Sequence, residues 1–276
     1  MLSPCRVCPR RCGADRLNGQ TGLCRTAAHA RVASAGAHFG EEPVLVGPGG
    51  SGTIFFAGCN LDCVFCQNYD ISHGVGGREV TVEQLAGIML DLQRRGCGNI
   101  NFVSPTHVAP QVLAATEEAR RRGLTLPTVY NCGGYESVEM LRRLAGRVDV
   151  YMPDFKWADP VSGRKYSGVA DYPEVARAAL AEMHRQVGPL RTGASALASG
   201  GVMVRHLVMP MDLARSEEVL RIVAEAAPGA GINVMGQYRP CYRADEFPEL
   251  VAMPDRAEVA RLRALAASLG LQRLDH

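Results

Sequence analysis

Six short apolar runs, each followed by a segment with helical periodicity, dominate the chain from residue 53 onward. A short apolar run bounded by turn residues predicts a buried strand, and apolar residues spaced three and four apart predict an amphipathic helix. Repeated strand–helix units predict an α/β protein whose parallel sheet has right-handed crossovers. Either an open doubly wound sheet or a partial barrel satisfies this pattern. The runs are Thr53–Ala57, Ile100–Val103, Pro127–Tyr130, Val148–Tyr151, Val202–Val208 and Ile232–Met235.

The first predicted helix is marked at both ends. Thr81 is its expected N-cap, and Gln84, three residues later, completes a capping box. Gly96 supplies the stop signal. The sequence therefore predicts a helix that begins just after Thr81.

Polar side chains lie at the carboxyl end of every predicted strand. In both candidate folds, ligands bind beyond the carboxyl ends of the parallel strands. We therefore expect an active site at this edge of the sheet. The polar segments are Cys59–Cys66, Ser104–His107, Asn131–Tyr135, Pro153–Lys156, Arg205–His206 and Gln237–Pro240.

The composition indicates a globular protein with a substantial core. Hydrophobic residues make up 47% of the 276 residues and charged residues 21%, which excludes a disordered chain. The net charge of +2 argues against a dedicated nucleic-acid or membrane-surface protein. No apolar run approaches the roughly 20 residues that span a bilayer. The N-terminus also lacks a secretory signal, so we expect a cytoplasmic protein.

Cys59, Cys63 and Cys66 lie within eight residues, directly after the first predicted strand. Ten cysteines in a cytoplasmic chain indicate metal binding or redox chemistry rather than disulfides. Three thiolates on one loop can hold three corners of an iron–sulfur cube. A fourth ligand does not follow at close spacing, which would leave one iron open to a cofactor or substrate. The alternative is a zinc site completed by His73 or Cys97.

The first fifty residues differ from the rest, with several glycines and no clear helical period. We predict a small cysteine-rich subdomain over residues 1–50 and a second domain over residues 51–276. Cys5, Cys8, Cys12 and Cys24 supply four thiolates, enough for tetrahedral zinc or a second iron–sulfur cluster. Free or redox-active thiols are the alternative.

The C-x3-C-x2-C spacing of the triplet, with Phe65 just before the last cysteine, resembles the signature of the radical SAM superfamily. In that superfamily the cysteines hold a 4Fe–4S cluster, and its unique iron binds S-adenosylmethionine (SAM). The resemblance implies a TIM-like partial (βα)6 barrel over residues 51–276. It also implies reductive cleavage of SAM to a 5′-deoxyadenosyl radical that abstracts hydrogen from a substrate.

Six further runs look like the PflX-type branch, which is similar to the pyruvate formate-lyase activating enzymes. This resemblance implies a glycyl-radical enzyme or other protein substrate as partner, and a flavodoxin- or ferredoxin-type electron donor. The alternatives are a radical SAM enzyme that modifies a small molecule, a peptide or RNA, and a metal-binding protein without catalysis. The runs are Cys66–Ser72, Ser104–His107, Tyr130–Tyr135, Pro153–Lys156, Arg205–Val208 and Asn233–Tyr238.

The resemblance also assigns residues to SAM. Asp154 and Lys156 match positions where related activases contact its amino and carboxylate groups, a pairing that electrostatics favours. An ordinary ion pair is the alternative. Ser104, Thr106 and His107 stand where much of the superfamily has Gly-Gly-Glu, so this chain departs from the pattern there. His107 is either a ligand contact or a histidine satisfied at the rim.

Four other side chains complete the predicted cofactor site. Arg205 and His206 are adjacent in a strand, so they point to opposite faces, and we favour Arg205 as the partner of a cofactor or substrate carboxylate. Asn131 and Gln237 are placed for hydrogen bonds to the ribose or adenine. Phe65 is the aromatic residue of the cysteine loop.

Overall fold

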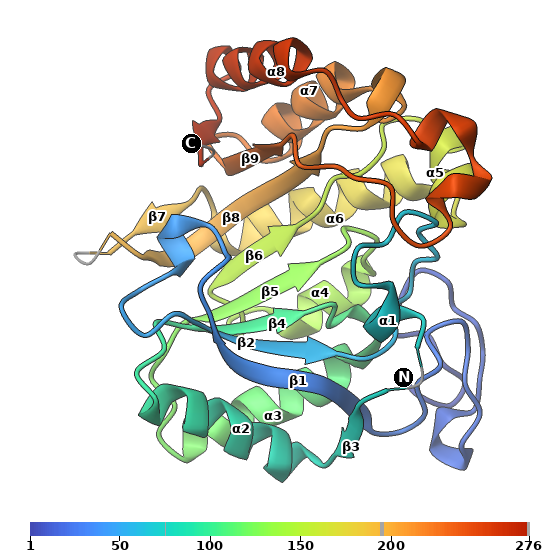
Figure 1. Cartoon of the computed structure of the whole chain (residues 1–276). Coiled ribbons are helices and arrows are strands. Elements are labelled where there is room, and N and C mark those ends of the chain that lie inside the picture. Colours follow the sequence, from blue (N-terminus) through green and yellow to red (C-terminus); the bar gives the residue numbers. More distant parts are fainter. Residues whose placement is uncertain (75, 194–195, 275–276) are drawn as a thin grey trace.

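The computed structural model describes residues 1–74, 76–193 and 196–274. Its main sheet has the strand order β10-β9-β8-β6-β5-β4-β2-β1-β3, with β7 paired to β8 (Figure 1). The strands are β1 (Ala30–His38), β2 (Ser51–Phe56), β3 (Arg78–Val80), β4 (Ile100–Val103), β5 (Thr128–Cys132), β6 (Val150–Pro153), β7 (Arg191–Thr192), β8 (Ala198–Leu207), β9 (Gly231–Met235) and β10 (Gln272–Arg273).

Helices connect these strands and cover the outer face of the sheet (Figure 1). Within the described residues, no helix is both long and apolar enough to cross a membrane. The α-helices are α1 (Tyr69–Ser72), α2 (Val82–Arg94), α3 (Ala109–Arg121), α4 (Val138–Leu144), α5 (Pro160–Ser167), α6 (Tyr172–Val187), α7 (Ser216–Ala226) and α8 (Arg256–Ser268). Two short 3-10 helices lie within the first fifty residues, η1 (Arg16–Asn18) and η2 (Pro43–Leu45).

The predicted α/β fold with a partial barrel is confirmed. All six predicted strands appear as β2, β4, β5, β6, β8 and β9, and each pairs in parallel with the next. The strand order runs from β10 at one edge to β3 at the other, so the barrel is open. The capping box is also present: the Thr81 side chain accepts from the Gln84 amide at 3.3 Å, and Gln84 Oε1 accepts from the Thr81 amide at 2.9 Å.

Alternation along the strands separates an apolar floor from a polar rim inside the barrel. Because neighbours in a strand point to opposite faces, residues two apart share one face. Val129 of β5 and Met203 of β8 join Leu45 of η2 in a buried interior cluster. Asn131 and Arg205, two residues further along these strands, line the cavity above it. The β1–β2 connection therefore plugs the barrel and leaves its carboxyl end open to ligands.

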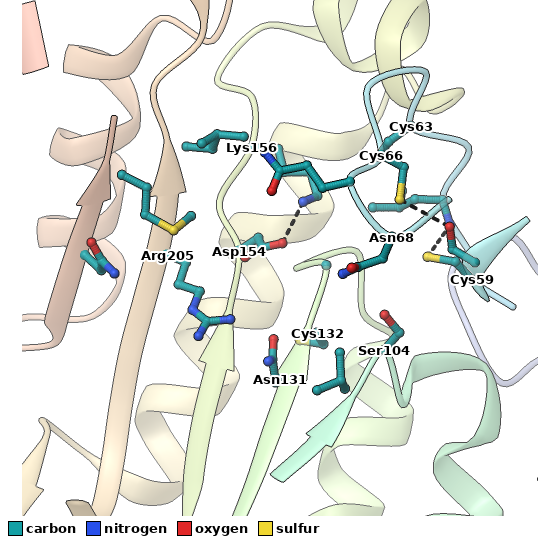
Figure 2. A pocket seen from close by; sticks show the side chains of 18 of the residues that line it. Cys59, Cys63, Cys66, Asn68, Ser104, Asn131, Cys132, Asp154, Lys156 and Arg205 are labelled. Carbon is teal, nitrogen blue, oxygen red and sulfur yellow. Dashed lines mark hydrogen bonds and ion pairs between the residues drawn. The ribbon is translucent and has the colours of Figure 1, made fainter. Parts of the chain in front are cut away.

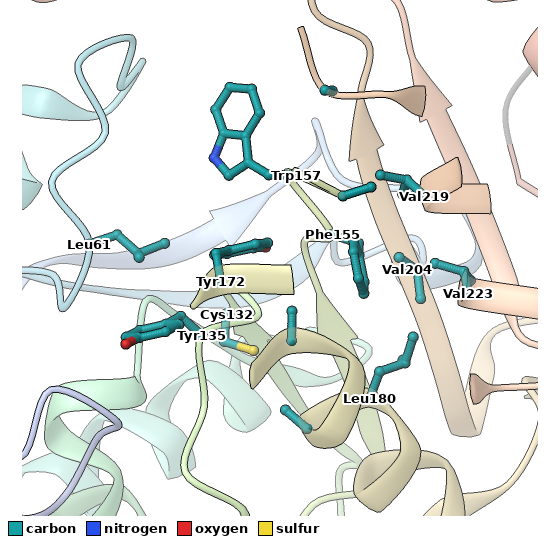
Figure 3. Close-up of a cluster of buried hydrophobic side chains, with 14 of the residues drawn as sticks. Leu61, Cys132, Tyr135, Phe155, Trp157, Tyr172, Leu180, Val204, Val219 and Val223 are labelled. Atoms are coloured by element: carbon teal, nitrogen blue, oxygen red, sulfur yellow. The ribbon is translucent and has the colours of Figure 1, made fainter. Parts of the chain in front are cut away.

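The largest apolar cluster lies between the sheet and the helices α4, α6 and α7. Figure 3 shows part of it, where Phe155, Trp157 and Tyr172 pack close behind the strand ends. The rings of Phe155 and Tyr172 meet edge to face, with centroids 6.2 Å apart. A second cluster joins α2 and α3 to β2 and β4. These layers hold the strand ends, and so the polar residues on them, in fixed positions.

Residues 30–38 form a strand that sequence analysis did not predict. β1 pairs antiparallel with β2 over six residue pairs, Val32↔Phe56 to His38↔Ser51. The predicted boundary at residue 50 therefore falls inside a strand pair, and the main sheet extends into the first fifty residues. The strand escaped prediction because its alanines, serine and glycine give no strong apolar alternation.

Candidate active site

The cysteine loop leaves the carboxyl end of β2 and runs to α1. Its three thiols lie on one side of a cavity, opposite Arg205 (Figure 2). Cys63 Sγ lies 3.1 Å from Ser167 Oγ, and Cys66 Sγ lies 3.2 Å from Ser72 Oγ. These hydroxyls can donate to the sulfurs, which is how proteins orient and tune thiolate ligands.

The cavity, of about 620 Å³, collects all of the residues predicted for the cysteine triplet and for SAM except His107, and none of the four N-terminal cysteines. They come from the cysteine loop and from the ends of five strands, although they are far apart in the sequence. The predicted residues that line it are Cys59, Cys63, Phe65, Cys66, Ser104, Thr106, Asn131, Asp154, Lys156, Arg205 and Gln237.

The chemistry of the loop fits an iron–sulfur cluster. Burial raises the pKa of Cys59 to about 12 and that of Cys63 to about 11. Thiols must lose their protons to bind metal, so binding here releases protons and offsets their repulsion with metal charge. In the described part of the chain, no three Cys, His, Asp or Glu side chains already converge as a metal site. The three cysteines of the loop therefore remain the predicted ligands of a cluster at this cavity.

Asp154 and Lys156 form an ion pair at the edge of this cavity. Lys156 Nζ lies 2.6 Å from Asp154 Oδ2, and both side chains are mostly buried (Figure 2). Burial opposes the charge on Lys156, but Asp154 and Cys63 outweigh burial and raise the pKa of the lysine. The Tyr172 hydroxyl accepts from the Lys156 amide at 2.9 Å, which anchors the backbone that carries the pair.

The segment after β4 places Ser104 and Thr106 in the cavity but turns His107 away from it. Ser104 has a left-handed backbone, with φ of 57°. His107 is buried, and its Nε2 lies 2.9 Å from the carbonyl oxygen of Ala57. Burial lowers the pKa of His107 to about 4, so the ring is neutral at physiological pH. Nδ1 of the same ring is buried without a hydrogen-bond partner, and His107 lies behind the rim rather than in the wall of the cavity.

Arg205, rather than His206, faces the cavity. Its guanidinium donates to Glu42 Oε1 at 2.7 Å, and its Nη2 lies 2.6 Å from a carboxylate oxygen of Glu41 and from one of Glu42. Asn233 of β9 also donates to Glu42, at 2.9 Å. His206 is buried on the opposite face, where its Nδ1 lies 2.7 Å from the carbonyl oxygen of Phe155.

Sequence analysis did not assign several polar residues of the cavity to the site, among them Glu41, Glu42, Asn60, Asn68, Asn233 and Arg263. The two glutamates lie in the β1–β2 connection, which carries no strand signal to place them. Asn233 alternates with apolar neighbours in β9, and that alternation was the available signal. Asn60 and Asn68 lie in or next to the cysteine loop, where position alone could have flagged them.

Phe65 packs in the wall of the cavity. Its ring meets the Trp157 ring edge to face, with centroids 5.5 Å apart, and it is nearly fully buried. This contact ties the cysteine loop to the segment that follows Lys156. Phe65 therefore has a structural role in holding Cys66 next to the Asp154–Lys156 pair.

The N-terminal cysteines lie directly behind the cysteine loop. Cys5, Cys8 and Cys24 are buried, whereas Cys12 is exposed. Arg10 Nε donates to the carbonyl oxygen of Asn60 at 2.5 Å, within the loop that carries the triplet. The Arg10 side chain thus ties this segment to the cysteine loop.

Glu136 is a buried carboxyl next to the cavity. It accepts hydrogen bonds from Thr106 at 2.5 Å and from Tyr130 at 3.3 Å. Burial raises its pKa from 4.5 to about 7, although these hydrogen bonds oppose the shift. The folded protein therefore holds this proton more tightly than the unfolded chain does.

The stability contributed by protonated Glu136 is present below pH 4.5 and is lost as the pH rises to about 7. We expect Glu136→Gln to remove this loss, which amounts to about 3 kcal/mol. Urea unfolding of both proteins at pH 5 and pH 8 measures it. If the free energies of unfolding of wild type and variant change equally between these pH values, Glu136 titrates normally and the expectation is wrong.

Sequence comparison matches this chain to one protein family and to two known proteins. Residues 53–192 match the sequence model of the radical SAM superfamily. The chain is 31% identical over 277 residues to an uncharacterized protein of Methanocaldococcus jannaschii, which covers 97% of this chain and 75% of that protein. It is 46% identical over 59 residues to the pyruvate formate-lyase-activating enzyme of Clostridium pasteurianum, covering 20% of this chain and 25% of that enzyme.

Two solved structures are similar at low sequence identity. HydG, a maturase of the FeFe hydrogenase, is 12% identical with a TM-score of 0.49, covering 81% of this chain and 55% of HydG. Methylornithine synthase (PylB) is 14% identical with a TM-score of 0.46, covering 80% of this chain and 71% of PylB.

Proposed function

The chain belongs to the radical SAM superfamily, whose members bind a 4Fe–4S cluster and SAM, and from this premise we propose that it is an activase acting on a protein substrate. The observation that carries the proposal is the single cavity that holds the three thiols of the cysteine loop and the Asp154–Lys156 pair. Three thiolates can bind three irons and leave the fourth for SAM. An acid and a lysine beside them suit the ammonium and carboxylate of the same molecule.

Cys59, Cys63 and Cys66 would hold the cluster. When bound and reduced by an external donor of the flavodoxin or ferredoxin type, it supplies the electron that splits SAM into methionine and a 5′-deoxyadenosyl radical. The apolar wall around Phe65 and the buried apolar floor would limit the access of water to the bound cofactor. The protein contributes orientation and a low dielectric environment.

The polar residues of the rim would orient SAM. Asp154 accepts from its ammonium, and Lys156 donates to its carboxylate. Asn131 and Gln237, from β5 and the segment after β9, present amides that suit the hydroxyls of the ribose and the nitrogens of the adenine. Ser104 places its backbone on the same rim. All of these groups lie on strand ends, which hold them more precisely than free loops could.

A backbone glycine of a partner enzyme is the proposed source of the hydrogen atom. The 46% identity over 59 residues with a pyruvate formate-lyase-activating enzyme supports this choice. All ten cysteines are free thiols, which supports a cytoplasmic location. The reaction balances as one electron from the donor, one SAM, methionine and 5′-deoxyadenosine as products, and a glycyl radical on the partner.

The acidic pair beside Arg205 favours a second candidate substrate, a small molecule with a cationic group. Two carboxylates, Glu41 and Glu42, share the single guanidinium of Arg205. Around Arg205 the two carboxylates thus outnumber the guanidinium, and this local acidic group would attract an ammonium group even though Arg263 also lines the cavity. A glycine in a polypeptide backbone has no such charge.

The first experiment is anaerobic reconstitution with iron and sulfide, reduction with dithionite, and assay of SAM. Formation of 5′-deoxyadenosine is expected, and its absence from a protein with an intact cluster would refute radical SAM chemistry. A second assay adds each glycyl-radical enzyme encoded in the same genome. A glycyl doublet in the electron paramagnetic resonance spectrum supports the activase. Transfer of deuterium from a labelled amine into 5′-deoxyadenosine supports the small-molecule candidate instead.

A further inference from the structure

Arg16, on η1 in the N-terminal segment, is a fully buried cation, only 1% exposed. Its Nε donates to the carbonyl oxygen of Ala27 at 2.9 Å, and its Nη1 donates to that of His107 at 2.7 Å. Nη2 is buried without any hydrogen-bond partner. Within the described residues, no carboxylate forms an ion pair with Arg16. A buried charge without a counter-charge is strongly destabilising, so this guanidinium needs an anion.

A cysteine, which can become negative, lies next to this guanidinium. Arg16 Nη1 lies 3.9 Å from Cys5 Sγ, and Cys5 is itself buried. The Cys5 amide donates to the carbonyl oxygen of Ala14 at 2.9 Å, and the Cys5 carbonyl accepts from the amide of Gly13 at 3.1 Å. Cys5 is therefore held in a short backbone loop, and its thiol lies beside the Arg16 guanidinium.

Cys8, Cys12 and Cys24 lie in the same N-terminal segment as Cys5. The Cys8 carbonyl accepts from the Arg11 amide at 3.1 Å, which closes a tight turn between Cys8 and Cys12. Cys12 Sγ lies against Gly22, where a Cβ would approach it to 2.7 Å. Gly22 is two residues before Cys24, so Cys12 already lies beside the stretch that carries the fourth thiol. Cys12 is the exposed member, and the ligand set can close from that side.

We propose that Cys5, Cys8, Cys12 and Cys24 bind a metal centre as four thiolates, and that Arg16 balances part of its negative charge. Four thiolates around a divalent zinc, or around a 4Fe–4S core of charge two plus, leave a net charge of about minus two. Binding releases the four thiol protons and changes no oxidation state. The centre thereby supplies the anion that the buried guanidinium lacks, and zinc and iron–sulfur are two forms of this one chemistry.

The position of this centre gives it a structural role next to the active site. A Cβ at Gly58 would lie 2.3 Å from the carbonyl oxygen of Cys24, and Arg10 donates to the carbonyl of Asn60. The N-terminal segment thus contacts the chain on both sides of Cys59. A metal that fixes the fold of this segment also holds the cysteine loop in place.

The metal content of a variant with Cys59, Cys63 and Cys66 all changed to alanine tests the site without the active-site cluster. We expect anaerobically purified variant to retain about one zinc, or about four iron with matching sulfide, per chain. In wild type the same centre appears as metal in excess of one 4Fe–4S cluster. A wild-type protein whose zinc and iron together amount to no more than one such cluster would overturn the proposal. This measurement does not involve SAM cleavage, so failure of the proposed function leaves it intact.

Two variants of Arg16 test the counter-charge. Arg16→Gln removes the charge, and Arg16→Lys keeps it while losing the guanidinium geometry. We expect a chelator competition to show about 10–100-fold weaker metal binding for Arg16→Gln and a smaller loss for Arg16→Lys. Arg120→Gln, at an arginine that pairs with Asp149 instead, is the control and should match wild type. Equal loss in the Gln and Lys variants, or no loss in either, would contradict a role for the charge.

Discussion

Replacing Cys63 with alanine is expected to abolish both the visible absorbance of the cluster and the formation of 5′-deoxyadenosine from SAM. Cys63 is buried, lines the cavity and lies 3.1 Å from the Ser167 hydroxyl. Its thiolate is one of three that would hold three corners of the cube. Apart from Cys59 and Cys66, which would hold the other two corners, the cysteine loop has no sulfur that could replace it. The measurement is product chromatography after anaerobic reconstitution and dithionite reduction.

Cys97→Ala is the matched control for this variant. Cys97 is equally buried, but it lies in the apolar cluster under α2 and α3, outside the cavity. It should keep full cluster absorbance and full SAM cleavage. Circular dichroism of both variants separates loss of the cluster from loss of the fold. Wild-type rates of SAM cleavage in Cys63→Ala would show that the triplet is not the reacting site.

Replacing Lys156 with methionine is expected to lower kcat/KM for SAM by about 100-fold, mainly through a higher KM. The substitution keeps the length of the side chain but leaves Asp154 without its partner at 2.6 Å. Loss of one member of a buried charge pair costs about 3 kcal/mol, which corresponds to this factor. The cluster absorbance should be unchanged, because Lys156 is not a cluster ligand.

The only other lysine of the chain provides the control. Lys165 pairs with Glu249 on the surface, with about half of its side chain exposed. An exposed pair contributes about 0–1 kcal/mol, so Lys165→Met should change kcat/KM less than about twofold. Titration of SAM in steady-state cleavage assays gives both constants. An unchanged KM in Lys156→Met would remove Lys156 from the SAM site.

Site features formed by residues a few positions apart could be predicted from the sequence. The cysteine triplet lies on one short loop, so its spacing alone puts the three cysteines on the same cavity. Asp154 and Lys156 are two apart at a strand end, and strand periodicity places them on one face. The same periodicity predicted that Arg205 and His206 point to opposite faces, but it could not say which one faces the cavity. Parallel strands then bring these ends to one rim, because right-handed crossovers leave little choice of topology.

Residues that act through distant contacts were not predictable. Glu42 meets Arg205 across 163 positions of sequence, because the β1–β2 connection folds into the barrel. His107 was expected at the rim, yet its ring turns back to Ala57, a choice made by local packing. The strand β1 has little propensity of its own and exists because β2 offers it an edge.

By itself, then, the order of residues determined the strand–helix repeat, the loop that can carry a cluster and the carboxyl edge at which chemistry occurs, since each follows from neighbours a few positions apart. Tertiary structure alone decided that Glu41 and Glu42 pair with Arg205 above the apolar floor, and that a buried Arg16 lies beside Cys5. Charge pairing depends on distances through space, and those distances exist only once the chain has closed around its core.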